Sequence, residues 1–560
     1  MGKVYGIDLG TTYSVISTLD DSGMPLVIRN DYDSKDTLAS AVYFQDGGDP
    51  VVGEEAKNQA EFEPEKVVQF VKREIGKETI TRTFDGIDYN AITISALILK
   101  RMKAYADEQG YDVNDVVITC PAYFGTEERN ATKQAGQIAG LNVLNIVNEP
   151  TAAALNYCCR EFQENKKILI YDLGGGTFDI TLINLTVDEN GKSSLEVLDT
   201  GGDDHLGGAD WDKRMYNCIV QQYQDETGKE EEAITLDEKN AMHAKVEEIK
   251  IGLTSVQSKS FTIKDEDGAP TRLEVTKEQF KEQTEDLVER TMGYVQHLLE
   301  SAGVSNEEID QVLLVGGSTK MPMIKDAIEN AFPGKWQSQD PDLAVAKGAA
   351  LAAAIEWNEK VKERQEKIDS GEMPAPEVTE EKLETIDVLG NISGGSEGFF
   401  KDILPRSFGP GIMADNVFMV DNLLFVGDPS PETVTKTYGT MVDNQTKLVV
   451  PIFENISKDH ENTLVTPCRD LNGNKQHADP ALKVKYLGEI TMELPPGLPH
   501  GAPIEIKCDF SVGGLNVTVT DLSSGKTILS EIVSANTYTE EEEVEEKCNM
   551  LSSINTSGQI

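Results

Sequence analysis

Two short turns rich in glycine and threonine could bind phosphate through the backbone. The segments Gly10-Thr11-Thr12 and Gly174-Gly175-Gly176-Thr177 each follow an apolar run that ends in an aspartate, Asp8 or Asp172. Consecutive backbone N–H groups bind phosphate oxygens well, and glycine lets the chain approach an anion closely. Either turn alone would suit an ordinary hairpin, but the matched pair predicts a polyphosphate clamp with hydrated magnesium beside the aspartates.

These turns belong to two copies of one strand–turn–strand pattern, from Val4 to Ser17 and from Ile168 to Ile183. Between the copies, helical patterns from Ala96 to Ala106 and from Thr126 to Ala139 flank a predicted strand from Val116 to Cys120. Strands that alternate with helices are typical of α/β layers. The sequence therefore predicts a duplicated α/β domain with the two turns facing each other.

The composition changes along the chain and predicts four parts. Residues 1–355 form the α/β domain, and residues 356–401 are a connector dominated by Glu and Lys, partly helical. Residues 402–536 show period-2 alternation and predict an all-β domain, for example from Lys447 to Phe453. Residues 537–560 form a short acidic tail that opens with a helix start signal.

The bulk properties exclude several classes of protein. A net charge of -46 over 560 residues argues against nucleic-acid binding, which requires a dense Lys and Arg footprint. No apolar stretch approaches membrane-spanning length, so we expect no membrane partner. Seven scattered cysteines without a C-x-x-C pair fit a reducing compartment, and we expect a cytoplasmic protein.

Four motifs resemble the heat-shock protein 70 chaperones of the DnaK type. They are Gly6-Ile-Asp-Leu-Gly-Thr-Thr-Tyr-Ser14, Asn148-Glu-Pro-Thr-Ala-Ala-Ala154, Asp172-Leu-Gly-Gly-Gly-Thr-Phe-Asp179 and Val315-Gly-Gly-Ser-Thr-Lys320. The resemblance implies an ATPase domain of the actin and hexokinase type, followed by a β-sandwich that binds peptides. It implies an ATP-dependent chaperone that hydrolyses ATP, takes part in protein folding and the stress response, and uses ATP or ADP, Mg²⁺ and K⁺.

The resemblance also assigns residues to the nucleotide site. The catalytic group is Lys72, Glu149, Thr177, Asp8, Asp172 and Asp179, of which Asp8, Asp172 and Glu149 would serve the metal ion. The nucleotide-binding group is Gly10, Thr11, Thr12, Tyr13, Gly174, Gly175, Gly176, Gly208, Glu247, Lys250, Thr254, Gly316, Gly317, Ser318, Lys320 and Asp342. Taken from the residues alone, Lys72 could be a surface lysine, and Glu247 with Lys250 could be an ordinary helical ion pair.

In the β domain, six residues fall where the family lines its peptide cleft. They are Ile412, Met413, Tyr438, Met441, Leu448 and Val450. Such a groove would take an extended apolar peptide through backbone hydrogen bonds, and pliable methionines suit loose recognition. The alternative is that all six belong to the sandwich core.

Three of the departures from the family pattern concern coupling between the domains. The family's Leu-rich linker has no clear copy, although residues 386–389 or 399–404 could replace it. Asn145 stands where the family has an arginine that helps a J-domain co-chaperone dock, while Asn148 is kept. The resemblance implies that the acidic tail corresponds to a remnant of the family's helical lid, and we expect rapid peptide exchange without a lid. The implied partners are unfolded polypeptides, a J-domain co-chaperone and a nucleotide-exchange factor.

Other functions on the same fold remain open at this point. A relative that binds ATP to fix its shape, as a holdase or a nucleotide-exchange factor, would hydrolyse little. A small-molecule kinase or a filament-forming ATPase would leave the β domain unexplained. Lys72 and Thr177 favour hydrolysis over binding alone.

Overall fold

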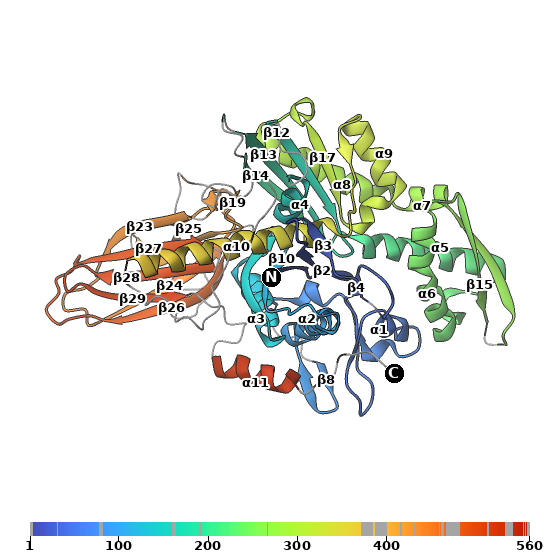
Figure 1. Cartoon of the computed structure of the whole chain (residues 1–560), viewed down its shortest axis with the longest axis horizontal. Helices are drawn as coiled ribbons and strands as arrows, with labels where there is room; N and C mark the ends of the chain where they lie inside the picture. The colour runs from blue at the N-terminus through green and yellow to red at the C-terminus, as the bar shows by residue number, and fades with distance from the viewer. Residues whose placement is uncertain are drawn as a thin grey trace.

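A computed structural model describes residues 4–556 of the chain, with gaps (Figure 1). The gaps are residues 31, 78–81, 159–163, 188, 190–192, 266, 371–384, 387–399, 415–416, 431, 459, 461–463, 466–481, 512–513, 532–540, 553 and 555. In Figure 1 the α/β domain fills the centre and right of the view, and the β domain extends to the left. The α/β domain has two lobes, each built on one sheet.

Lobe I is built on a sheet with the strand order β11-β10-β1-β2-β3. Its strands are β1 (Val4–Asp8), β2 (Tyr13–Leu19), β3 (Pro25–Val27), β10 (Asp115–Cys120) and β11 (Asn142–Asn148), and β4 (Leu38–Ala39) also pairs with β2. Strands β1, β10 and β11 are parallel, whereas β2 and β3 complete an antiparallel meander. The first glycine–threonine turn joins β1 to β2.

Lobe II repeats this topology in the order β18-β17-β12-β13-β14. Its strands are β12 (Lys166–Leu173), β13 (Phe178–Val187), β14 (Ser193–Asp203), β17 (Gln311–Val315) and β18 (Trp336–Gln337). Here too a three-stranded antiparallel meander is extended by two parallel strands. The second glycine–threonine turn joins β12 to β13, so the predicted duplication is confirmed.

Helices cover both sheets. Lobe I carries α1 (Glu54–Gln59), α2 (Ala91–Glu108), α3 (Thr126–Ile138) and α4 (Glu149–Cys158), with short strands β5 (Val42–Tyr43), β6 (Val51–Val52), β7 (Val67–Val68), β8 (Arg82–Phe84) and β9 (Ile87–Tyr89). Lobe II carries α5 (Gly208–Thr227), α6 (Leu236–Gly252), α7 (Lys277–Gln283), α8 (Glu285–Ala302) and α9 (Pro322–Ala331), with the hairpin β15 (Ser258–Lys264) and β16 (Pro270–Thr276). Among the described residues, no helix combines the length and apolar character needed to cross a bilayer.

The long helix α10 (Ala344–Asp369) packs closely against lobe I. Its alanine-rich first half is buried, and its glycine lets the helix approach α4 closely: a Cβ at Gly348 would lie 1.6 Å from the carbonyl oxygen of Ala152. A Cβ at Gly6 of β1 would likewise lie 2.0 Å from the Ala350 nitrogen. The helix continues past residue 355, so the first part of the predicted connector is helical.

The β domain is a sandwich of two antiparallel sheets. One has the order β25-β21-β20-β24-β26 and the other β23-β27-β28-β29. Their bounds are β20 (Ser407–Ala414), β21 (Val417–Asp421), β23 (Glu432–Gly439), β24 (Lys447–Asn455), β25 (Leu464–Val465), β26 (Lys485–Glu493), β27 (Pro503–Ser511), β28 (Gly514–Asp521) and β29 (Lys526–Glu531). Buried and partly exposed side chains alternate along β28, as the period-2 pattern predicts, and the buried ones join the apolar core.

Two segments link the β domain and the tail to the α/β domain. Strand β19 (Phe400–Ile403) extends the lobe II sheet by pairing in parallel with β14, and it also pairs with β22 (Pro429–Ser430). Helix α11 (Glu541–Ser552) packs on α3 of lobe I, and Leu551 is fully buried in the core of that lobe. Lys100 donates a hydrogen bond to the carbonyl oxygen of Ile554 at 2.6 Å.

Candidate nucleotide-binding and catalytic cleft

The two glycine–threonine turns meet across the gap between the lobes. A Cβ at Gly175 would lie 1.8 Å from Thr12 Oγ1, and a Cβ at Gly176 would lie 2.4 Å from Thr11 Cγ2. A side chain at either glycine would therefore push the lobes apart. The Arg73 guanidinium of lobe I donates a hydrogen bond to the Gly176 carbonyl oxygen at 3.0 Å, which ties the second turn to the first lobe.

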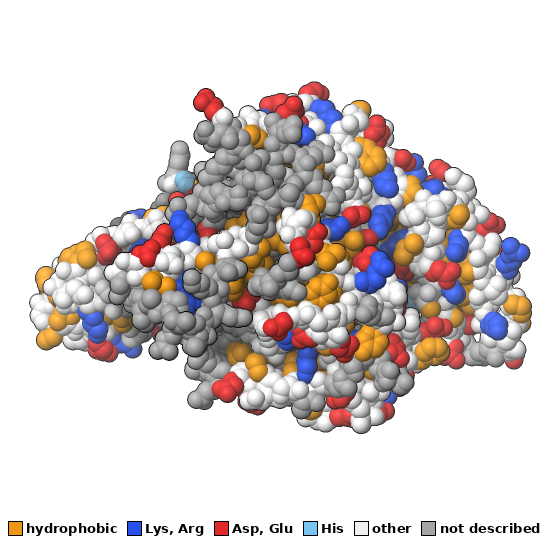
Figure 2. Space-filling view, viewed as in Figure 1, with side chains coloured by type: hydrophobic (Ala, Val, Ile, Leu, Met, Phe, Trp, Pro, Cys, Tyr) orange, Lys and Arg blue, Asp and Glu red, His pale blue; other side chains and the backbone are white. Residues whose placement is uncertain are grey.

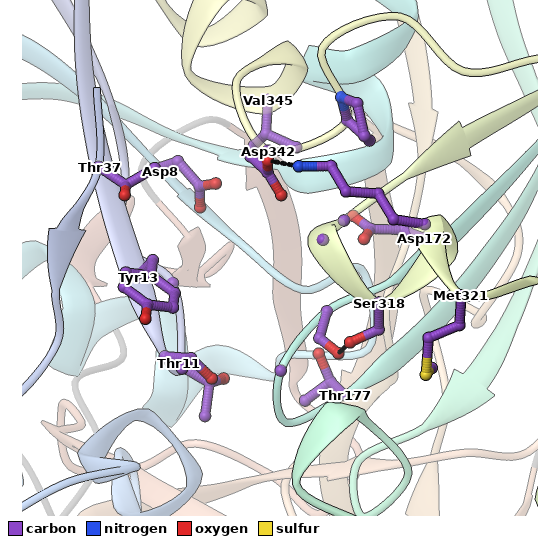
Figure 3. A pocket seen from close by; sticks show the side chains of 18 of the residues that line it. Asp8, Thr11, Tyr13, Thr37, Asp172, Thr177, Ser318, Met321, Asp342 and Val345 are labelled. Atoms are coloured by element: carbon purple, nitrogen blue, oxygen red, sulfur yellow. Dashed lines mark hydrogen bonds and ion pairs between the residues drawn. The ribbon is translucent and has the colours of Figure 1, made fainter. Parts of the chain in front are cut away.

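A cavity of about 320 Å³ lies between the turns (Figure 3). In Figure 3, Asp8, Thr11 and Tyr13 line one side, while Asp172, Thr177, Ser318 and Asp342 line the other. Nineteen sequence-predicted residues line it: Asp8, Gly10, Thr11, Thr12, Tyr13, Lys72, Glu149, Asp172, Gly174, Gly175, Thr177, Glu247, Lys250, Thr254, Gly316, Gly317, Ser318, Lys320 and Asp342. The fold thus brings together segments separated by more than 300 residues.

Lys72 is buried in the floor of this cavity and is not a surface lysine. It lies in a short 3₁₀ turn, Val71–Glu74, is 6% exposed, and forms an ion pair with Glu149, the first residue of α4. Burial alone would lower the pKa of Lys72, but the carboxylates of Glu149 and Asp8 outweigh it and raise the pKa. The lysine therefore stays protonated and presents a positive charge to the cavity.

Three aspartates surround this ion pair. Burial, together with the charge of Glu149, raises the pKa of Asp8 to about 7, although Lys72 opposes the shift. Burial and Glu149 also raise the pKa values of Asp172 and Asp179 well above the usual range. Four carboxyl groups around one lysine leave excess negative charge, which a bound cation would neutralise.

The donor chemistry suits magnesium bound through water. Among the described residues, no three carboxylate, histidine or cysteine side chains converge as a ready metal cage. Magnesium, however, keeps several water ligands and is bound by one or two carboxylates together with substrate phosphates. Asp8, Asp172 and Glu149, which all line the cavity, fit such outer contacts.

The far end of the cavity is closed by contacts between α1 and α6. Lys57 of α1 forms an ion pair with Glu247 of α6 and donates a hydrogen bond to the Tyr13 hydroxyl at 2.7 Å. Burial opposes ionisation of Glu247, but Lys57 and Lys250 hold the pKa of Glu247 below its usual value. Glu247 thus pairs with Lys57 of α1, and Lys250 pairs with Asp212 of α5. The two residues are therefore not an ordinary ion pair on the surface of one helix.

Several residues that line the cavity belong to no sequence motif and were not predicted. Asp212 of α5 lies 2.7 Å from Lys250 and holds its ammonium in the cavity wall. Burial raises the pKa of Asp212, and Lys250 opposes the shift. The other unpredicted lining residues are Thr37, Ile251, Met321, Pro341 and Val345. These residues come together only in the folded chain, so no motif or spacing in the sequence could have identified them.

Three predicted residues do not line the cavity but support its walls. Asp179 is 1% exposed and lies beneath the second turn, where it is the register partner of Asp172. The Gly208 N–H, in the first turn of α5, donates to the Gly174 carbonyl oxygen at 2.9 Å. Gly176 is the residue at which Arg73 and the two turns meet.

The predicted peptide-binding residues divide by exposure. Met413 is 39% exposed and Met441 is 55% exposed, whereas Val450 is 3% exposed and belongs to the sandwich core. Tyr438 and Leu448 are partly buried against that core, and the Tyr438 hydroxyl donates to Asp421 at 2.9 Å. Ile412 lies in β20 and is partly exposed. Figure 2 shows hydrophobic side chains at the outer, left-hand end of the β domain.

The positions that depart from the family pattern have defined surroundings. The Asn145 side chain donates to Glu356 of α10 at 2.8 Å, and Asn148 accepts a hydrogen bond from Arg129. Of the two candidate linkers, residues 387–389 and 399 lie outside the described part of the chain. Residues 400–403 form β19 on the edge of the lobe II sheet.

Comparisons with known proteins agree with this geometry. The model of the family described as Hsp70 protein matches residues 4–85 and 76–365. The chaperone protein DnaK of Thermotoga petrophila is 34% identical over 536 residues, which cover 93% of this chain and 79% of that relative. The chaperone protein DnaK of Thermotoga sp. strain RQ2 is similar to the same extent.

Proposed function

Because the chain belongs to the Hsp70 protein family, we propose that it hydrolyses ATP in the cavity between its glycine–threonine turns. The chain is an ATP-dependent chaperone of this family, and its β domain would bind extended apolar segments of unfolded proteins. The observation that carries the proposal is the buried ion pair of Lys72 and Glu149 in the floor of the cavity, beside the two glycine–threonine turns.

The residues of the cavity suggest how hydrolysis would proceed. Backbone N–H groups of the two turns would hold the phosphates, and the Thr177 hydroxyl would orient the terminal one. Lys72, kept charged by Glu149 and Asp8, would hold the attacking water and neutralise negative charge that develops on the phosphate. Phosphoryl transfer to water depends mainly on such positioning and charge neutralisation.

The acidic residues would serve cations. Asp8, Asp172 and Glu149 would hold a hydrated Mg²⁺ ion, and Asp179 would contribute to the negative field that attracts K⁺. Bound magnesium would neutralise part of the phosphate charge and so lower the charge that the protein must neutralise. Without a cation, the raised pKa values of Asp8 and Asp172 indicate that the site would take up protons instead.

The adenosine would lie toward α6, between Glu247, Lys250 and Thr254 on one side and Gly317, Ser318, Lys320 and Asp342 on the other. A Cβ at Gly317 would lie 2.6 Å from Asp342 Oδ1, so a side chain there would displace the Asp342 carboxylate. The proposal includes the four domain boundaries given above and a cytoplasmic location. It also includes unfolded polypeptides, a J-domain co-chaperone and a nucleotide-exchange factor as partners.

Single-turnover hydrolysis tests the proposal. At saturating Mg·ATP, Lys72→Ala should hydrolyse ATP at least about 100-fold more slowly than the wild type. The variant lacks the ammonium group that would hold the attacking water and neutralise the developing negative charge. The matched control is Lys362→Ala, which removes an exposed lysine of α10. A Lys72→Ala rate within about threefold of the wild type would contradict hydrolysis by this site.

A further inference from the structure

The β domain touches lobe I through a buried carboxylate. Glu454 lies near the end of β24, is 5% exposed, and faces the first turn of α3. The Thr126 N–H of α3 donates toward Glu454 Oε2 at 3.5 Å, and a Cβ at Gly125 would lie 3.3 Å from both carboxylate oxygens. Glu454 therefore fills the space that the glycine at the start of α3 leaves open.

The charged groups around Glu454 do not neutralise its carboxylate. From α3, Glu128 accepts a hydrogen bond from the Gly125 N–H at 3.0 Å, which places a second carboxylate beside Glu454. From β26, Lys485 lies opposite Glu454 in register, yet its ammonium pairs with Glu127 of α3.

Arg406, just before β20, is the other nearby cation. Its Nη1 donates to the Pro405 carbonyl oxygen at 2.9 Å. Within the described part of the chain, no ion pair to Glu454 is formed.

This environment favours the protonated carboxyl group. Burial is the main cause that raises the pKa of Glu454 to about 7, and the charge of Glu128 adds to the shift. Arg406 and the Thr126 N–H act in the opposite direction but are too weak to restore the usual value. When the β domain leaves α3, the side chain would be exposed to water and would return toward an ordinary glutamate pKa.

We propose that docking of the β domain on α3 is coupled to proton uptake by Glu454, so that this contact is a proton-sensitive latch between the two domains. The docked state has the higher pKa and binds the proton more tightly, so acidification favours docking. The advantage is fully present below the undocked pKa and is lost as pH rises through about 7. From these values, the docking constant should rise about tenfold between pH 8 and pH 6.

Other contacts between the domains orient the docked state. Lys485 pairs with Glu127, and Lys458 approaches Asp199 of β14 at 3.3 Å. Glu454 and the Lys485–Glu127 pair both contact the first turn of α3, so a displacement of α3 would affect both contacts. The inference concerns this contact and does not depend on hydrolysis in the nucleotide cleft.

Hydrogen–deuterium exchange of the full chain tests the latch. Protection of residues 124–130, corrected for the intrinsic exchange rate, should increase about tenfold from pH 8 to pH 6 in the wild type. In Glu454→Gln, a neutral isostere, protection should already be high at pH 8 and should change less than about twofold with pH. The measurement is made both without nucleotide and with a saturating magnesium complex of a non-hydrolysable ATP analogue.

Two further variants make the outcome decisive. Glu356→Gln is the matched control: it removes another carboxyl whose pKa burial raises to about 7, but in α10 beside Asn145. It should keep the wild-type pH profile at residues 124–130. Glu128→Gln retains an oxygen to accept from Gly125 and removes the neighbouring charge, so the midpoint of the profile should move to lower pH.

The inference is overturned if the wild type shows no pH dependence in either nucleotide condition, or if Glu454→Gln keeps the wild-type profile. If Glu454→Gln proves unfolded, the wild-type profile and Glu128→Gln decide the question. Protection of residues 172–178 by the ATP analogue reports nucleotide binding separately, so a failure of the proposed function is distinguished from a failure of the latch.

Discussion

The nucleotide cleft and the peptide-binding candidates of the β domain differ in how firmly the fold holds their side chains. In the cleft, Lys72, Glu149 and Asp172 are each less than 8% exposed and lie in one network of charges. In the β domain, the Met413 and Met441 side chains are both exposed to solvent. The cleft is organised before a ligand arrives, whereas the β domain offers an adaptable apolar surface.

The difference predicts large effects in the cleft, and the largest should come from Gly175→Ala. The new methyl would overlap Thr12 Oγ1 and separate the two glycine–threonine turns. We expect at least about a 100-fold loss of ATP affinity, or about 2.7 kcal/mol, by titration calorimetry. Gly293→Ala, in α8 with open space around its Cβ, is the control and should bind ATP normally. Normal ATP binding by Gly175→Ala would show that the turns do not form the clamp.

A smaller effect is expected where the cleft is closed by side chains alone. Lys57→Ala removes the ion pair with Glu247 and the hydrogen bond to Tyr13, which together join α1 to α6. Release of a fluorescent ADP analogue in stopped flow should become about tenfold faster, equivalent to about 1.4 kcal/mol. Lys245→Ala removes an exposed ion pair within α6 and should leave the release rate unchanged. Equal rates for the wild type and Lys57→Ala would mean that this contact does not retain nucleotide.

The smallest effect should come from the β-domain surface. Met441→Ser removes an exposed apolar side chain from the loop between β23 and β24, and it should weaken binding of an extended apolar peptide by about threefold in fluorescence anisotropy. Leu529→Ser changes a more exposed apolar position on β29 and should leave affinity unchanged. A loss above about 30-fold at Met441 would place it in a rigid site and remove the contrast with the cleft.

Much of the cleft could be predicted because its chemistry is local. Each glycine–threonine turn is a short run of glycine and threonine that follows an aspartate and joins two strands, and the second copy repeats the first. The sequence predicted the helix from Ala344 from its run of small residues. These residues are small because only small side chains fit between α10 and the strands of lobe I. Assignment of Lys72 to the site required the resemblance to the family, since its own surroundings in the sequence resemble a surface turn.

The remainder depends on contacts between distant elements. Asp212 has no motif of its own and becomes part of the cavity only because α5 and α6 bring it to Lys250. Exposure varies only over the first three residues of β24, and every residue from Val450 to Asn455 is buried. Val450 joins the sandwich core, which the strand pattern in the sequence had left open. Helix α11 was predicted from its acidic start, whereas its packing on α3 depends on the surface of lobe I.

The most direct test of the account is whether nucleotide in the cleft controls peptide on the β domain. A fluorescent extended apolar peptide is bound to the full chain, and its release is followed after addition of excess unlabelled peptide with Mg·ATP, with Mg·ADP or without nucleotide. Mg·ATP should speed release at least about tenfold over Mg·ADP, and Gly175→Ala should abolish this difference. The same release rate in all three conditions would contradict an ATP-dependent chaperone.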